Sequence, residues 1–292
     1  MKFEGILPAL ITPLTAEEKL NVPVLHKLVN YLLDEGADGL YIGGATGEGP
    51  ALRQDVREEL AAESIAAMKG RKPAIVHIAS MDFHEAVELA KQAERCGADA
   101  ISAIPPLFFA YDEDDVYNYY KALAESVHIP LMIYYNMAAG FRISAKFAAR
   151  MFEVDNITAI KWTSSAYDEM VLLKDLTHGE MNIINGPDEM LLMGLNAGAD
   201  GGIGTTYNFQ CSRIKGIYNN FKAGNIAEAQ KLQTEANRII DALKNYKVLP
   251  GSKVIMERMG FAVGNASFPM KSYTEAQKDQ MMADFIAAGL KI

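Results

Sequence analysis

Ile157-Thr158-Ala159-Ile160-Lys161-Trp162-Thr163 is a short, mostly apolar run with a single lysine, and polar residues follow it at 163–165. A run of this length and composition is typical of a buried strand. Lys161 would then lie where the strand leaves the core, half out of water. Desolvation disfavours the charged form of a lysine, and a neutral amine can attack a ketone to give a Schiff base. The ordinary alternative is a lysine that extends its amine to solvent and has no chemical role.

Strand-like and helix-like segments alternate along the chain up to about residue 220, with no linker or low-complexity segment between them. Regular alternation favours parallel strands joined by helical crossovers, which is the α/β class. Eight such units in a chain of this length favour a (β/α)8 TIM barrel over an open sheet. The predicted strands lie at residues 5–13, 38–43, 73–79, 100–105, 129–135, 157–163, 181–185 and 200–205.

A weak internal repeat supports this prediction. Gly36-Ala37-Asp38, Gly97-Ala98-Asp99 and Gly198-Ala199-Asp200 each stand between a helical pattern and a strand. A glycine in that place is typical of a helix C-cap. From about Asn225 the pattern becomes helical only. We therefore expect a barrel over residues 1–224 and a C-terminal helical extension over residues 225–292, packed on the barrel as a single structural unit.

Composition limits the cellular setting. The chain has 292 residues, half of them hydrophobic, and a mean hydropathy near zero, which suits one large soluble domain. No apolar run approaches the roughly 20 residues that cross a bilayer, and the N-terminus lacks the pattern of a signal peptide. The two cysteines, Cys96 and Cys211, lie far apart and do not indicate a disulfide framework. We expect a cytoplasmic protein with no membrane partner.

Charge and histidine spacing limit the partners. The net charge is −9 and the acidic residues are spread out, which disfavours nucleic acid as a partner. A local site can still hold a small anionic substrate. The five histidines fall on separate segments, and none has a metal-ligand spacing with a cysteine or another histidine. The sequence therefore predicts a small-molecule substrate and no metal.

Polar residues follow several of the predicted strands, and in a parallel barrel these strand ends share one face. Loop amides and a threonine hydroxyl suit a carboxylate. A lysine suits a ketone, a tyrosine beside it suits proton transfer, and acidic and hydroxyl groups suit a polyol. The residues are Thr46, Tyr134 or Tyr135, Lys161, Thr163, Gly186, Asp188, Glu189, Ile203 and Thr205.

Each of these residues also has an ordinary structural interpretation. The glycine-rich loop at residues 43–48 matches no dinucleotide or Walker motif and could be a tight turn before a helix. Tyr134 and Tyr135 could be core aromatics, and Asp188 and Glu189 could complement a helix dipole. Their convergence at one rim favours the functional interpretation.

Three segments of the chain and the Ile160-Lys161 strand resemble the N-acetylneuraminate lyase and dihydrodipicolinate synthase superfamily of class I aldolases. The similarity spans about residues 5–210 and is closest to the lyase branch. The segments are Gly43-Gly44-Ala45-Thr46-Gly47-Glu48, Asn185-Gly186-Pro187-Asp188-Glu189 and Gly198-Ala199-Asp200-Gly201-Gly202-Ile203-Gly204-Thr205-Thr206-Tyr207-Asn208.

The resemblance implies a pyruvate-dependent lyase that cleaves a 2-keto-3-deoxy sugar acid, with N-acetylneuraminate giving pyruvate and N-acetylmannosamine as the first expectation. It implies that Lys161 forms the imine and that Tyr134 moves the proton. It also implies a homotetramer and no organic or metal cofactor. The residues expected at the carboxylate are Ala45, Thr46 and Ile203, and those expected at the polyol are Thr163, Gly186, Asp188, Glu189 and Thr205.

Three departures from the family pattern leave alternatives open. Ala45 replaces the usual serine or threonine, Phe108 replaces a tyrosine, and the loop at residues 134–140 is short. Counting along the strand selects Tyr134 for proton transfer, whereas matching the Tyr-Asn pair selects Tyr135. The arginine of the synthase branch is missing from this loop. The alternatives are another 2-keto-3-deoxy sugar-acid aldolase, a 4-hydroxy-tetrahydrodipicolinate synthase-like enzyme, and a catalytically silent binding protein.

Overall fold

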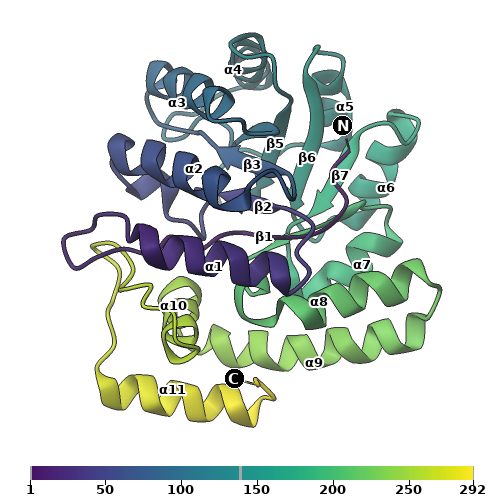
Figure 1. Ribbon diagram of the computed structural model, residues 1–292. Coiled ribbons are helices and arrows are strands. Elements are labelled where there is room, and N and C mark those ends of the chain that lie inside the picture. Colours follow the sequence, from purple (N-terminus) through teal and green to yellow (C-terminus); the bar gives the residue numbers. More distant parts are fainter. Residues whose placement is uncertain (1, 138–139, 292) are drawn as a thin grey trace.

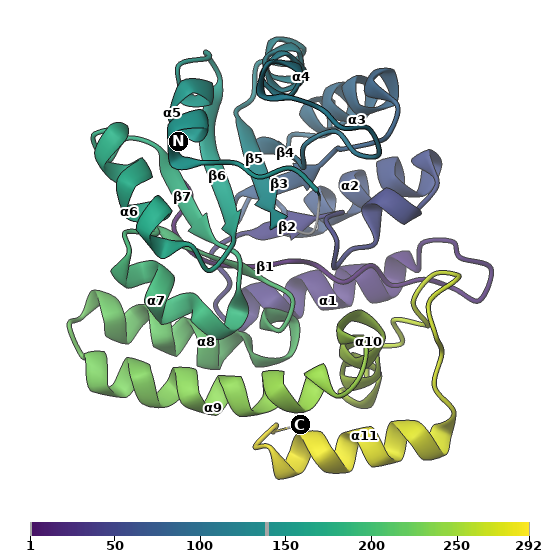
Figure 2. The same cartoon turned by 180° about the vertical axis from the view of Figure 1, so that it is seen from behind.

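The computed structural model describes residues 2–137 and 140–291, so Ala138 and Ala139 of the predicted short loop lie outside the described residues. Parallel strands lie at the centre and helices surround them (Figures 1 and 2). The strands are β1 (Gly5–Pro8), β2 (Leu40–Ile42), β3 (Ala74–His77), β4 (Ala100–Ala103), β5 (Leu131–Asn136), β6 (Ile157–Thr163), β7 (Asn182–Asn185) and β8 (Gly201–Gly204).

Helices follow the strands in turn, as the sequence predicted. The helices are α1 (Val22–Asp34), α2 (Gln54–Met68), α3 (Phe83–Arg95), α4 (Glu113–Glu125), α5 (Ala145–Phe152), α6 (Tyr167–Leu176), α7 (Leu191–Asn196), α8 (Tyr207–Lys222), α9 (Ile226–Lys244), α10 (Val248–Arg258) and α11 (Glu275–Ala287). Short 3-10 helices η1 (Gly49–Ala51) and η3 (Asp188–Met190) lie in the loops after β2 and β7.

The first strand closes the barrel. β1 pairs with β8 in parallel, and on its other side Leu10 N donates to Tyr41 O at 2.9 Å just beyond the end of β1. At the β1–β8 seam a Cβ on Gly201 would lie 2.2 Å from Gly5 O, so only glycine fits there. The (β/α)8 TIM barrel with C-terminal helices that the sequence predicted is confirmed.

The Gly-Ala-Asp repeat has one structural role at all three sites. Its glycines have φ values of +95°, +87° and +100°, which is the left-handed conformation of a helix C-cap. The aspartate of each repeat accepts a hydrogen bond of 2.9 Å from a backbone N–H near the start of a strand. The pairs are Asp38 with Ile6, Asp99 with Ala74 and Asp200 with Ile183.

Side chains alternate between two hydrophobic layers along each strand. On β6, Ile160 and Trp162 point outward into the large core between strands and helices. Ala159 points inward, where it meets apolar side chains from the other strands, and Lys161 shares its face. Strand parity therefore directs the lysine side chain into the barrel near its carboxyl end.

The C-terminal helices lie against one side of the barrel (Figure 1). Helix α9 begins at Ile226, four residues after α8 ends at Lys222, and packs along it, while α10 and α11 pack against α9. The division into folding units at 224/225 stays a prediction. Among the described residues, no helix has the length and apolar character that spanning a bilayer would require.

Candidate active site

Adjacent strands β2 to β6 each bring one polar side chain into the carboxyl end of the barrel. All five are buried. Four of them stand two positions after an inward-facing residue of the same strand, and the fifth, on β2, is itself an inward-facing residue. They are Tyr41, His77, Ser102, Tyr134 and Lys161.

The Lys161 amine is held by aromatic faces. Its side chain is 5% exposed, and Nζ lies 4.0 Å from the ring centroid of Tyr134 and 4.5 Å from that of Tyr41. Within residues 2–137 and 140–291 no ion pair joins Lys161 to a carboxylate. An amine in this position is placed to act as a nucleophile, and the ring faces can meet positive charge that forms on it.

The two candidate tyrosines point to opposite sides of β5. Tyr134 pairs in register with Lys161 and lies inside the barrel, with its ring edge-on to Tyr41 and to His77 at 6.0 Å. Its hydroxyl lies 3.5 Å from Asn136 Nδ2. Tyr135 points outward and packs on Trp162, with ring centroids 4.9 Å apart. The geometry brings Tyr134 beside the amine, and its role in proton transfer stays a prediction.

Sequence reasoning missed Tyr41, His77 and Ser102. Tyr41 donates a hydrogen bond to Ser102 Oγ at 3.0 Å. Burial, helped by the positive charges of Arg57 and Lys161, lowers the pKa of His77 to about 3, so its ring is neutral. The signal that could have found them is strand parity, because each lies on the inward face near the end of a predicted strand.

The glycine-rich loop after β2 meets the loop after β8. Thr46 Oγ1 and Thr205 Oγ1 lie 2.6 Å apart, and Thr46 is 7% exposed. Ala45 is exposed, whereas Ile203 is buried inside the barrel with Tyr134. The structure thus brings Thr46, which the sequence predicted at a carboxylate, against Thr205, which it predicted at a polyol, and both roles stay predictions.

Asp188 is a buried carboxyl at the start of η3. Its Oδ2 accepts hydrogen bonds from Thr206 N at 2.7 Å and from Thr206 Oγ1 at 2.6 Å. Burial raises the pKa of Asp188 to about 6, against the opposing effect of these hydrogen bonds and of the Lys161 charge. A Cβ on Gly204 would lie 2.4 Å from Asp188 Oδ1, so the glycine makes room for the carboxyl.

Thr163 and Gly186 lie against each other at the ends of β6 and β7. A Cβ on Gly186 would come 2.0 Å from Thr163 Oγ1, so a larger residue does not fit. The Thr163 hydroxyl oxygen is buried and has no hydrogen-bond partner among the described residues. A substrate hydroxyl could supply the missing partner.

Glu189 is joined to the C-terminal extension. Its carboxylate lies 3.2 Å from Lys244 Nζ of α9, and its backbone oxygen accepts from Asn237 Nδ2 at 3.1 Å. The predicted contact of Glu189 with a polyol stays a prediction.

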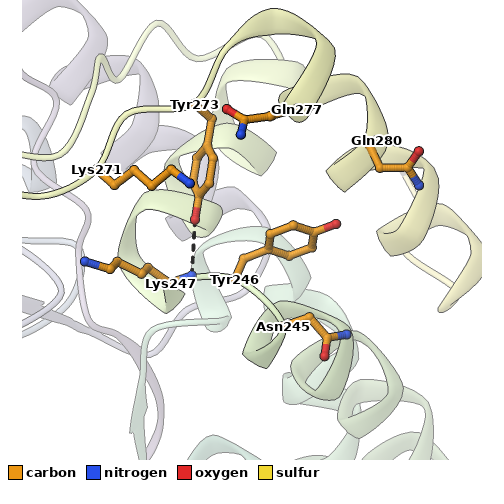
Figure 3. A pocket seen from close by; sticks show the side chains of 7 residues that line it. All are labelled: Asn245, Tyr246, Lys247, Lys271, Tyr273, Gln277 and Gln280. Carbon is orange, nitrogen blue, oxygen red and sulfur yellow. Dashed lines mark hydrogen bonds between the residues drawn. The ribbon is translucent and has the colours of Figure 1, made fainter.

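A surface pocket of about 370 Å³ lies elsewhere, between the end of α9, the start of α10 and the segment that leads into α11. Figure 3 shows Tyr246 and Tyr273 facing this pocket, where the Tyr273 hydroxyl accepts a hydrogen bond from Lys247 N at 3.2 Å. None of the predicted site residues lines it. The pocket is therefore separate from the group around Lys161.

Comparisons with known proteins agree on one family. The model of the Dihydrodipicolinate synthetase family matches residues 2–288. N-acetylneuraminate lyase of Rhizobium meliloti (strain 1021) is 35% identical over 278 residues, which cover 94% of this chain and 92% of that relative. The solved N-acetylneuraminate lyase of Proteus mirabilis has a TM-score of 0.95 and 28% identity, with 100% of both chains covered. A dihydrodipicolinate synthase of Bacillus anthracis has a TM-score of 0.93 and 26% identity, covering 98% of this chain and 99% of that one.

Replacing Asp188 by asparagine should change how stability depends on pH. The pKa of Asp188 is about 6 in the folded protein, above its ordinary value of 3.8. The folded protein therefore keeps a proton that the unfolded chain releases, and the contribution of Asp188 to stability falls as pH rises from about 4 to about 6. Asparagine does not titrate, so the Asp188→Asn variant does not lose stability in this way as pH rises. We expect the thermal midpoint of Asp188→Asn, relative to wild type, to increase over this range and to stay level above it.

The exposed Asp175 provides the matched control, and the midpoint of Asp175→Asn should run parallel to that of the wild type. An Asp188→Asn difference that stays constant from pH 4 to pH 7 would contradict the raised pKa.

Proposed function

The chain belongs to the dihydrodipicolinate synthetase family, and we propose that this class I aldolase cleaves N-acetylneuraminate to pyruvate and N-acetylmannosamine. The observation that carries the proposal is the buried Lys161 amine, which lies over two tyrosine rings and has no carboxylate partner in the described part of the chain. The similarity to proteins named N-acetylneuraminate lyase supports this choice of substrate.

The first step is Schiff-base formation. The neutral amine of Lys161 attacks the C2 ketone of the open-chain sugar acid to give a carbinolamine. The carbinolamine hydroxyl takes the Tyr134 proton and leaves as water, which gives an iminium ion and a Tyr134 phenolate. The positive charge then lies close to the faces of Tyr41 and Tyr134, which stabilise a cation without donating a proton to it. The iminium is the electron sink for the next step, so the reaction needs no organic or metal cofactor.

The second step breaks the C3–C4 bond. The Tyr134 phenolate, acting as a base, removes the proton of the C4 hydroxyl, and C4 becomes the aldehyde carbon of N-acetylmannosamine. The electron pair of the C3–C4 bond moves into the iminium and leaves an enamine of pyruvate on Lys161. Protonation at C3 and hydrolysis then release pyruvate and restore the amine.

The two ends of the substrate are assigned to two groups of residues. The amides of Ala45 and Thr46, together with Ile203, would bind the carboxylate. Thr46 Oγ1 lies 2.6 Å from Thr205 Oγ1 of the other group, so the two groups adjoin, as binding of one substrate by both requires. The residues assigned to the polyol are Thr163, Gly186, Asp188, Glu189 and Thr205. Above about pH 6 the Asp188 carboxylate is ionised and can accept hydrogen bonds from sugar hydroxyls.

We further propose that the protein is a cytoplasmic homotetramer whose partner is a small keto acid. Exposed apolar side chains near the ends of β3 and β4 support an interface between copies: Met81 is 74%, Phe108 81% and Phe109 70% exposed. Light scattering should give four times the chain mass, and Phe108→Ser with Phe109→Ser should lower it. A monomeric mass for the wild type would refute the assembly.

Borohydride trapping tests the Schiff base. The wild type incubated with pyruvate and borohydride should gain one reduced pyruvate adduct, which peptide mass spectrometry should locate on Lys161. Lys161→Met should gain none and should lose at least about 10³-fold in kcat for N-acetylneuraminate cleavage. An adduct on another lysine, or none on the wild type, would overturn the mechanism.

A substrate panel accompanies the trapping. The enzyme could trap pyruvate and turn over a different 2-keto-3-deoxy sugar acid but not N-acetylneuraminate. That result would support the Schiff-base mechanism and contradict the proposed substrate. Stabilisation by pyruvate without turnover would indicate a silent binding protein.

Conservative tyrosine substitutions separate the two candidates for proton transfer. Tyr134→Phe should lower kcat by roughly 10²- to 10⁴-fold, because it removes the hydroxyl beside the amine. Tyr135→Phe is the matched control and should stay near the wild type, because Tyr135 packs outward on Trp162. Both variants should still trap pyruvate on Lys161. A larger loss in Tyr135→Phe would reverse the assignment.

A further inference from the structure

Glu48 and Lys253 form a buried ion pair that joins the glycine-rich loop to α10. The distance from Glu48 Oε1 to Lys253 Nζ is 2.6 Å, and the two side chains are 0% and 2% exposed. Taking both charges out of water is costly, and their attraction only offsets this cost when the geometry is well fixed. A pair this deep therefore indicates a fixed position for the loop more than a gain in stability.

The C-terminal extension supplies the partners of both side chains of this pair. Glu48 Oε2 accepts hydrogen bonds from Ser267 N at 2.6 Å and from Ser267 Oγ at 2.7 Å. Lys253 Nζ also donates to Asn265 O at 2.9 Å. The carboxylate is thus held by two hydrogen-bond donors of Ser267 and by the ammonium of Lys253, all far along the chain from the loop.

The backbone of the loop depends on where Glu48 is held. Glu48 has φ of +60°, a left-handed conformation that a glutamate rarely adopts and that its surroundings must enforce. Its N–H donates to Ala45 O at 3.1 Å, and Gly49 N donates to Gly44 O at 3.2 Å, so Glu48 closes the turn. On the other side of the turn, Thr12 Oγ1 donates to Gly47 O at 2.6 Å.

Thr46 lies within this turn, two residues before Glu48. We propose that Lys253 is a positioning residue: through Glu48 it holds Thr46 and the neighbouring amides in the conformation that binds a keto-acid carboxylate. The identity of the ligand rests on the proposed function, whereas the effect on the loop does not.

Loss of Lys253 has a definite physical consequence. In Lys253→Met the Glu48 carboxylate is left in the interior without its cation, so it must take up a proton or move toward water. Movement toward water opens the turn that carries Thr46. In the double variant Glu48→Gln with Lys253→Met no charge is buried, so the turn can keep its remaining hydrogen bonds. The double variant should therefore be closer to the wild type than the single one.

The first measurement is borohydride trapping at increasing pyruvate concentration. For Lys253→Met we expect the half-saturating pyruvate concentration to rise about tenfold or more, because a small displacement of binding groups has large effects. The fraction trapped at saturation should stay that of the wild type, because Lys161 is untouched. The double variant should show a smaller rise.

The second measurement needs no ligand. Hydrogen–deuterium exchange of the amides at residues 44–49 should be faster in Lys253→Met than in the wild type and should be slower again in the double variant. Where Lys253→Met does not fold, the double variant and Ser267→Ala, which removes one donor to Glu48, are compared with the wild type in the same way.

Lys278→Met is the matched control. Lys278 is a largely buried lysine of α11 that pairs with Glu257 and with Glu275 at 2.9 Å, and both partners lie within the extension. This variant should be destabilised but should leave half-saturation and loop exchange as in the wild type.

Unchanged exchange and half-saturation in folded Lys253→Met would overturn the positioning role, and so would equal shifts in Lys278→Met. If the wild type traps no pyruvate while Lys253→Met still speeds exchange of the loop, the proposed function fails and the positioning role stands.

Discussion

The contact between one buried amine and two tyrosine rings is the constraint that the rest of the structure must satisfy. A lysine inside a protein is costly unless a carboxylate or an aromatic face meets its charge. Here Tyr134 comes from the neighbouring strand in direct register, and Tyr41 comes from β2, across the barrel interior. The barrel must close for Tyr41 to reach the amine, so the hydrogen bonds between β1 and its two neighbours are part of the site.

The sequence predicted the fold because its information is local. Apolar runs, helical spacing and the Gly-Ala-Asp repeats each act over a few residues, and each aspartate then ties a helix end to the start of a strand. Lys161 could also be predicted from the sequence, because a lone lysine in an apolar strand is unusual. Tyr41, His77 and Ser102 were not predicted as site residues. Residues of these types are common in a core, and they indicate a site only when strand parity is followed around the whole barrel.

Other parts of the site depend on contacts that no local pattern contains. Glu189 was predicted to contact a polyol, which stays a prediction, and its carboxylate also meets Lys244 of a helix that begins after the barrel. Glu48 looked like the end of a glycine-rich turn, yet it meets Lys253 and Ser267. Such pairs join residues that are distant along the chain, and a buried charge gives no sign in sequence of which partner it will find. Only the packed structure identifies them.

The Glu48–Lys253 ion pair also has a consequence for the order in which parts of the chain can fold during synthesis. Ribosomes deliver the chain from its N-terminus, so every strand of the barrel emerges before Lys253 and Ser267 do. A barrel without residues 253–267 would carry an unpaired acid at the turn that Glu48 closes. Closure of this turn therefore depends on a segment that contributes no residue to the group around Lys161.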